Sequence, residues 1–107
     1  MGVYRIRNMV NGRSYVAASN DIRARFNRHR MSLKTNNESV KALLADWNEF
    51  GENAFEFETL DSLEPLDRPG AGLTYDPMDD LKVLEALWLE KLQPYEPEGY
   101  NRVIIER

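Results

Sequence analysis

Apolar and polar residues alternate along residues 3–7 (Val-Tyr-Arg-Ile-Arg), a pattern typical of a strand with one buried face. Residues 14–17 have the character of a returning strand. Between the two strands stand Asn11 and Gly12, a pair that tolerates the positive φ angles of a tight turn. The pattern predicts a β-hairpin at the start of the chain.

Helical spacing replaces alternation after the hairpin. A first helix is predicted over residues 22–33, preceded by side chains that can cap it, Ser19, Asn20 and Asp21. The spacing of Ile22, Phe26, His29 and Leu33 places them on one stripe of this helix. A second helix is predicted from residue 38 or 39 to residue 50, where Gly51 ends it. Its apolar positions are Val40, Leu43, Leu44 and Trp47.

The second half of the chain predicts one more strand and one more helix. Residues 54–60 alternate strictly, and a helix is expected from about Met78 to Leu92, closed by Pro94. Residues 62–78 are rich in proline, glycine and acids and predict a loop roughly three times the usual length, which is typical of functional or mobile segments. Residues 99–105 are expected to add a turn and a short final strand.

The order β-β-α-α-β-α predicts an α+β fold, a small antiparallel sheet of three strands flanked by helices, in one domain over residues 1–107. The composition, 42% hydrophobic and 30% charged, is that of a soluble globular protein. The absence of cysteine excludes disulfides and thiolate metal sites. No apolar run is long enough for a membrane span and no signal peptide is recognisable, so a cytoplasmic location is expected.

Charge is distributed unevenly along the chain. Up to Lys41 there are nine basic and two acidic residues, a net charge of +7, whereas the remainder carries −11 and the whole chain −4. The basic half suits a phosphate backbone, with the acidic half turned away. In the alternative interpretation the two halves attract each other.

Three groups of residues are candidates for chemistry. Glu85 falls inside the apolar stripe of the third helix, where a carboxylate needs a divalent cation or an arginine partner. Arg25 and His29, four residues apart, share a helix face and suit phosphate binding and proton transfer, although a lone histidine there is more often a core residue. Tyr4 and Tyr15 lie on facing strands and are either packing residues or phenols aimed at a site. Four further cations are candidates for contact with DNA phosphates: Arg23, Arg28, Arg30 and Lys34.

The combination and order of these residues resembles the signature of the GIY-YIG nuclease family, above all the catalytic domains of homing endonucleases. The resemblance spans nearly the whole chain. It is carried by Gly2-Val3-Tyr4, Tyr15-Val16-Ala17, Arg25, His29, Gly51, Phe55-Glu56-Phe57, Glu85 to Leu89 and Gly99-Tyr100-Asn101.

The resemblance implies one-metal hydrolysis of DNA, with RNA left open as a substrate. Glu85 would bind Mg²⁺ or Mn²⁺, Tyr4 or Tyr15 would position or deprotonate the attacking water, Arg25 would neutralise the phosphate, and His29 would assist proton transfer. Asn101 would give a supporting hydrogen bond. Sequence specificity would come from a separate domain or protein.

Three features depart from the family pattern. Ala17 replaces a glycine, which would cost about 1 kcal/mol if the position needs positive φ. Asn37 is assigned to the place of a second histidine, and the acidic loop, with Asp79 and Asp80 after it, would repel DNA nearby. These features keep two alternatives open: a weak or inactive nucleic-acid-binding module, and a protein-interaction domain.

Overall fold

The computed structural model describes residues 1–62 and 77–101 of the chain. Three strands, β1 (Gly2–Asn8), β2 (Ser14–Ser19) and β3 (Phe55–Ser62), form one antiparallel sheet in the order β2-β1-β3. The helices are α1 (Ile22–Lys34), α2 (Lys41–Phe50) and α3 (Pro77–Leu92), with a short 3₁₀ helix, η1 (Glu52–Ala54), before β3. The predicted fold class and element order are confirmed.

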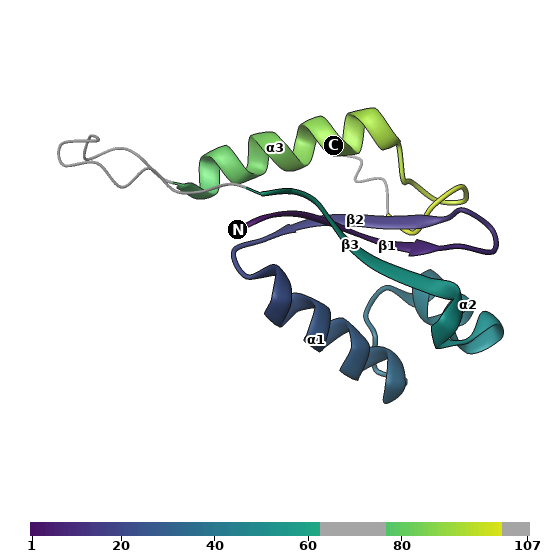
Figure 1. The fold of residues 1–107 in the computed structure, drawn as a ribbon. Helices are drawn as coiled ribbons and strands as arrows, with labels where there is room; N and C mark the ends of the chain where they lie inside the picture. Colours follow the sequence, from purple (N-terminus) through teal and green to yellow (C-terminus); the bar gives the residue numbers. More distant parts are fainter. Residues whose placement is uncertain (63–76, 102–107) are drawn as a thin grey trace, which may run out of the picture.

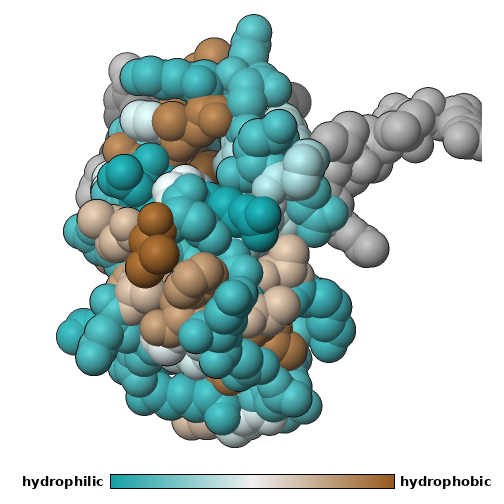
Figure 2. All heavy atoms as spheres, turned by 90° about the vertical axis from the view of Figure 1, so that its right-hand side faces the viewer, coloured by the Kyte–Doolittle hydropathy of each residue, from teal (hydrophilic) through white to brown (hydrophobic). Residues whose placement is uncertain are grey.

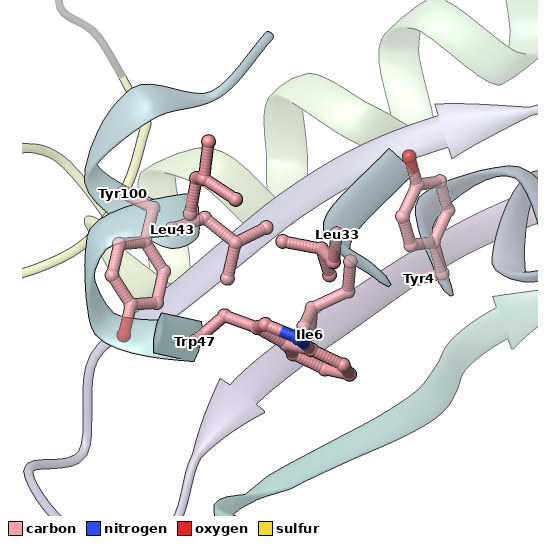
Figure 3. Packing of buried hydrophobic residues seen from close by; sticks show 7 residues of the cluster. Tyr4, Ile6, Leu33, Leu43, Trp47 and Tyr100 are labelled. Carbon is pink, nitrogen blue, oxygen red and sulfur yellow. The ribbon is translucent and has the colours of Figure 1, made fainter. Parts of the chain in front are cut away.

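Helices cover both faces of the sheet: α1 and α2 lie on one side and α3 on the other (Figure 1). Side chains of successive strand residues point to opposite faces, so Tyr4 and Ile6 face α1 and α2 whereas Val3 faces α3. The main core lies on the first of these faces (Figure 3). Its buried members are Tyr4, Ile6, Leu33, Leu43, Leu44, Trp47 and Tyr100.

The most buried positions of α1 and α3 lie on the stripes that the spacing predicted. On α1, His29 and Leu33 are buried, and on α3 Leu81 is buried while Val83 and Leu87 remain 61% and 58% exposed. Burial of one stripe per helix is what binds each helix to the sheet, because apolar area removed from water stabilises by about 25 cal/mol per Å².

Two element boundaries differ from the prediction. Helix α2 begins at Lys41 rather than at residue 38 or 39, because the Glu38 side chain binds the backbone N–H groups of Ser39 and Val40 and turns the chain there. Helix α3 begins at Pro77, and proline suits a first helical position because its missing N–H is not needed there.

Two predicted segments lie wholly or mainly outside the described residues. Most of the 62–78 loop falls there, as does the final strand beyond Asn101. What is described of the C-terminal segment is a bridge between Tyr95 and Asn101. Within the described residues, no helix has the length and apolar character needed to cross a membrane.

The end of the molecule that carries the β1–β2 turn is mainly hydrophilic, with apolar groups scattered through it (Figure 2). Two of the exposed apolar residues, Met9 and Val10, lie in that turn. The turn is held by Asn8, whose side-chain oxygen accepts from the N–H groups of Val10 and Asn11 over 2.9 and 3.4 Å. Gly12 adopts φ +79°, as the turn signal predicted.

Candidate active site

Tyr4, Tyr15 and His29 meet on the face of the sheet that α1 and α2 cover, where β1 and β2 pass beneath α1. The Tyr4 hydroxyl and His29 Nε2 are 2.9 Å apart, and both side chains are buried. The Tyr15 ring lies 6.4 Å from the Tyr4 ring and 5.7 Å from the imidazole, measured between centroids. His29 on α1 is thus a buried residue with a polar partner on strand β1, so it is not merely a packing residue.

Burial is the largest influence on the two tyrosines of the site, and it raises the pKa of both Tyr4 and Tyr15. The negative charges of Glu38 and Glu85 raise these pKa values further, whereas Arg25 lowers them. Both phenols are therefore protonated near neutral pH.

Arg25 is half-buried and stands one helical turn before His29 on α1. Within the described residues, no carboxylate lies within ion-pairing distance of its guanidinium. A guanidinium without a carboxylate partner in that part of the chain is suited to bind an anion such as a phosphate oxygen.

Glu85 reaches the site from the other side of the sheet. It is half-buried on α3, and its Oε2 accepts the Ala18 N–H over 2.9 Å at the outer edge of β2. The alternative of an arginine partner is not met among residues 1–62 and 77–101, where no basic group pairs with Glu85. Its other oxygen makes no hydrogen bond within those ranges, which leaves an oxygen ligand for a cation.

These residues fit a Mg²⁺ or Mn²⁺ ion held by a single carboxylate. In the described part of the chain, histidine and acidic side chains do not gather in threes as an enclosed metal site would require. Mg²⁺ retains most of its water ligands and is commonly bound by one or two carboxylates together with substrate phosphates. One half-buried glutamate at the outer edge of β2 meets that requirement.

Asn101 binds the neighbouring part of the same edge. Its side chain accepts the Val16 N–H over 2.9 Å and donates to the Val16 carbonyl over 2.7 Å. Gly99 allows this approach, because a Cβ at that position would lie 2.2 Å from the Pro94 carbonyl oxygen. These two hydrogen bonds join Asn101 to the strand that carries Tyr15.

Sequence reasoning missed Glu38. It is 4% exposed, and its Oε1 pairs with His29 Nδ1, opposite the nitrogen that meets Tyr4. Asn37, which was assigned to the place of a second histidine, is exposed and donates to Thr35 instead. A signal was available, because Glu38 and the helix-capping Asp21 are the only acidic residues up to Lys41.

A second buried carboxylate, Asp46 on α2, was also missed. Its Oδ2 accepts the Tyr100 hydroxyl over 2.7 Å and the Asn11 side-chain amide over 3.1 Å. Asn8 in turn donates to the Tyr100 oxygen over 3.2 Å. These hydrogen bonds connect Tyr100, which precedes Asn101, to α2 and to the β1–β2 hairpin.

The family pattern has glycine at two positions, which are Gly2 and Ala17 in this chain, and the structure sets different demands on them. Ala17 lies in regular strand, opposite Tyr4, and is not among the positive-φ residues of the described chain. The expected cost of alanine therefore does not arise. Gly2 is required, because a Cβ there would lie 2.1 Å from the Asp61 carbonyl oxygen on β3.

The four candidate phosphate contacts divide into two kinds. Arg23, Arg28 and Lys34 are exposed along α1. Arg30 instead stacks on the aromatic rings beneath the helix, with its guanidinium carbon 4.5 Å from the centre of the Phe57 ring. This contact gives Arg30 a packing role that its spacing along the helix did not indicate.

A cavity of about 440 Å³ adjoins the site. It lies between the start of α2 and the C-terminal segment, and its wall includes Tyr15, Ser39, Lys41 and Asn101.

Comparison with known proteins adds to this geometry. No protein-family model matches the sequence, and a search of curated proteins gives no match. The solved structures that it resembles have the fold of GIY-YIG nuclease catalytic domains, so the resemblance seen in the motifs is confirmed at the level of the fold.

The first of these structures is the catalytic domain of homing endonuclease I-TevI, with a TM-score of 0.75 and 24% identity over 96% of this chain and 98% of that one. A mutant of the catalytic domain of intron endonuclease I-TevI gives a TM-score of 0.72 and 26% identity over 94% of this chain and 90% of the other.

Proposed function

We propose that this chain is a metal-dependent endonuclease that hydrolyses phosphodiester bonds in DNA. One set of residues carries the proposal. Tyr4 pairs with His29, and half-buried Glu85 lies at the outer edge of β2. Arg25, one helical turn before His29, has no carboxylate partner within the described residues. The likeness to a homing endonuclease catalytic domain supports the choice of DNA.

In this proposal, Glu85 holds Mg²⁺ or Mn²⁺ through its carboxylate. The cation, when bound, polarises the scissile phosphate and stabilises the leaving oxygen. Arg25 binds a non-bridging phosphate oxygen and offsets the charge that accumulates during attack. Tyr15 positions the attacking water by hydrogen bonding, and Tyr4 with His29 carries the proton away.

Binding to the backbone of DNA is assigned to Arg23, Arg28 and Lys34, which are exposed along α1 beside the site. Contacts of this kind give affinity without sequence preference. A preference for particular sequences would therefore depend on a separate domain or protein. The chemistry at phosphorus does not itself distinguish DNA from RNA, so both are substrates to be compared.

The test is nicking of supercoiled plasmid at low salt with Mg²⁺, Mn²⁺ or EDTA, with a labelled RNA hairpin in parallel. Glu85→Gln keeps an acceptor for the Ala18 N–H while removing the negative charge. Glu90→Gln, on the exposed side of the same helix, is the matched control. We expect metal-dependent nicking by the wild type and Glu90→Gln, and none by Glu85→Gln.

Nicking that persists in Glu85→Gln would contradict the metal assignment. A folded wild-type protein that binds DNA without cutting it would instead support the second candidate, a nucleic-acid-binding module without turnover. The observation that favours this candidate is the net charge of −4, because an acidic protein gains less from a polyanionic substrate.

A further inference from the structure

The two ring nitrogens of His29 have different partners. Nε2 lies 2.9 Å from the Tyr4 hydroxyl, and Nδ1 pairs with the Glu38 carboxylate. All three side chains are at least nine-tenths buried by residue exposure, with Tyr4 at 1%, His29 at 7% and Glu38 at 4%. Tyr4, His29 and Glu38 thus form a continuous buried row from β1 through α1 to the turn before α2.

The chemistry of Glu38 determines which nitrogen carries the proton. An ionised carboxylate can only accept hydrogen bonds, so Nδ1 must donate. In the neutral imidazole, Nε2 is then without a proton and accepts the Tyr4 O–H. Free histidine has no such constraint, so the arrangement depends on the carboxylate.

Glu38 is itself held in place by the backbone. Its Oε2 accepts the Ser39 N–H over 2.7 Å and lies 3.4 Å from the Val40 nitrogen. The carboxylate therefore has one oxygen fixed by the turn and the other directed at His29. A side chain fixed in this way orients its partner better than a mobile one, because little rotational freedom is left to lose.

We propose that Glu38 is a positioning residue, which fixes His29 with Nε2 as proton acceptor and thereby makes Tyr4, rather than Tyr15, the phenol that takes the proton from the attacking water. This inference rests on the proposed function. Within the described residues, the Tyr15 hydroxyl has no hydrogen-bond partner that could receive its proton, whereas Tyr4 has His29.

The step balances as a relay. An O–H bond of water breaks and its proton joins the Tyr4 oxygen, while the Tyr4 proton passes to His29 Nε2. The water oxygen forms a bond to phosphorus, the bond from phosphorus to the leaving oxygen breaks, and the leaving oxygen takes a proton from solvent. The imidazolium that results is stabilised by Glu38. Because burial raises the pKa of Tyr4, a relay that never leaves a free tyrosinate suits this site.

The chain contains a single histidine, so the proton position can be read directly. In a ¹⁵N-labelled protein at mildly alkaline pH, long-range ¹H–¹⁵N spectra distinguish a protonated from a bare ring nitrogen. We expect a protonated Nδ1 and a bare Nε2 in the wild type. Tyr4→Phe should keep this pattern, because Glu38 remains, and Glu38→Gln should lose it.

Glu49→Gln is the matched control, since Glu49 is an exposed glutamate on the adjacent α2 helix. In the nicking assay, Glu38→Gln should lower kcat about 100-fold, the lower end of what positioned proton transfer contributes. KM for DNA should stay unchanged, because Glu38 is buried and does not touch the substrate. Circular dichroism and thermal melting establish that each variant is folded.

A protonated Nε2 in the wild type would overturn the proposal, whether or not Glu38→Gln folds. So would a folded Glu38→Gln that keeps both the wild-type spectrum and the wild-type kcat. If the wild type gives the expected spectra but does not cut DNA, the positioning of His29 by Glu38 is supported and the nuclease function is contradicted. The two proposals can therefore fail independently.

Discussion

The side-chain amide of Asn101 pairs with the backbone of Val16 through two hydrogen bonds, one donated and one accepted. It takes the position that a neighbouring strand would take at the outer edge of β2. Val16 follows Tyr15 directly, so this pair sets the position of the strand beneath the candidate site.

Replacing Asn101 with aspartate should therefore destabilise the fold. Aspartate lacks the donor and sets a negative charge against the Val16 carbonyl, and we expect the free energy of unfolding to fall by about 1–3 kcal/mol. Urea unfolding followed by circular dichroism measures this. Asn53→Asp, at an exposed position of η1, is the control and should change little. Equal stability of the two variants would contradict the role given to Asn101.

Arg25→Ala should reduce cleavage without a comparable loss of stability. The charge of Arg25 lowers the pKa of Tyr4 and Tyr15. Because its proposed role is to bind the phosphate, kcat should fall by about 10²–10³. Arg23→Ala removes an exposed charge from the same helix and should weaken DNA binding only slightly. If Arg25→Ala retained the wild-type kcat, as Arg23→Ala is expected to do, Arg25 would have no part in the reaction.

The two glycine positions of the motif should respond in opposite ways to exchange with alanine. Ala17→Gly adds backbone freedom within a strand and should lower stability by about 0.5–1 kcal/mol, with no gain in kcat. Gly2→Ala forces β1 and β3 apart, because its Cβ would lie 2.1 Å from the Asp61 carbonyl oxygen. We expect a cost of about 1–3 kcal/mol. Thermal unfolding of both variants tests this, and a more active Ala17→Gly would show that the departure at this position is costly.

The salt dependence of DNA binding should separate Arg28 from Arg30. Arg28→Ala should reduce the slope of log K against log salt by about 1, because an exposed phosphate contact is lost. Arg30→Ala should leave the slope unchanged and lower stability by about 0.5–2 kcal/mol, because its guanidinium stacks on Phe57. Fluorescence anisotropy at several salt concentrations measures the slope. A change of slope in Arg30→Ala alone would reverse the assignment.

Alkaline pH should unfold the protein through its buried tyrosines. Burial raises the pKa of Tyr4, Tyr15 and Tyr100, whereas in the unfolded chain tyrosine ionises near pH 10. Their contribution to stability is full below about pH 10 and is lost as the pH rises from there through the folded pKa values. Urea midpoints should therefore fall above about pH 10, less steeply in Tyr4→Phe than in the wild type.

Much of the fold follows from local spacing. Alternation in β1 and β3 places apolar residues on one face of each strand, and the stripe of α1 does the same for that helix. A short window of sequence is therefore enough to predict each of these elements. Glu85 could be singled out for the same reason, as a carboxylate within an apolar stripe, and the structure places it half-buried beside Leu84.

The contacts that the sequence did not indicate are tertiary. Arg30 meets Phe57 across 27 positions of sequence, and helical spacing carries no information about such a partner. Glu38 lies in a turn, where the direction of a side chain depends on backbone angles rather than on a period. The sequence alone could not show that alanine is tolerated at position 17. Only the strand geometry shows that this position needs no positive φ.

The outer edge of β2 has a consequence for how copies of this protein behave in solution. An open edge strand presents free N–H and C=O groups and can join the edge of another molecule, which leads to aggregation. Here Asn101 and Glu85 occupy the Val16 and Ala18 positions of that edge. The side chain offered as the cation ligand therefore also protects the sheet from self-association, and variants that shorten Glu85 should be checked for oligomers before any loss of activity is ascribed to chemistry.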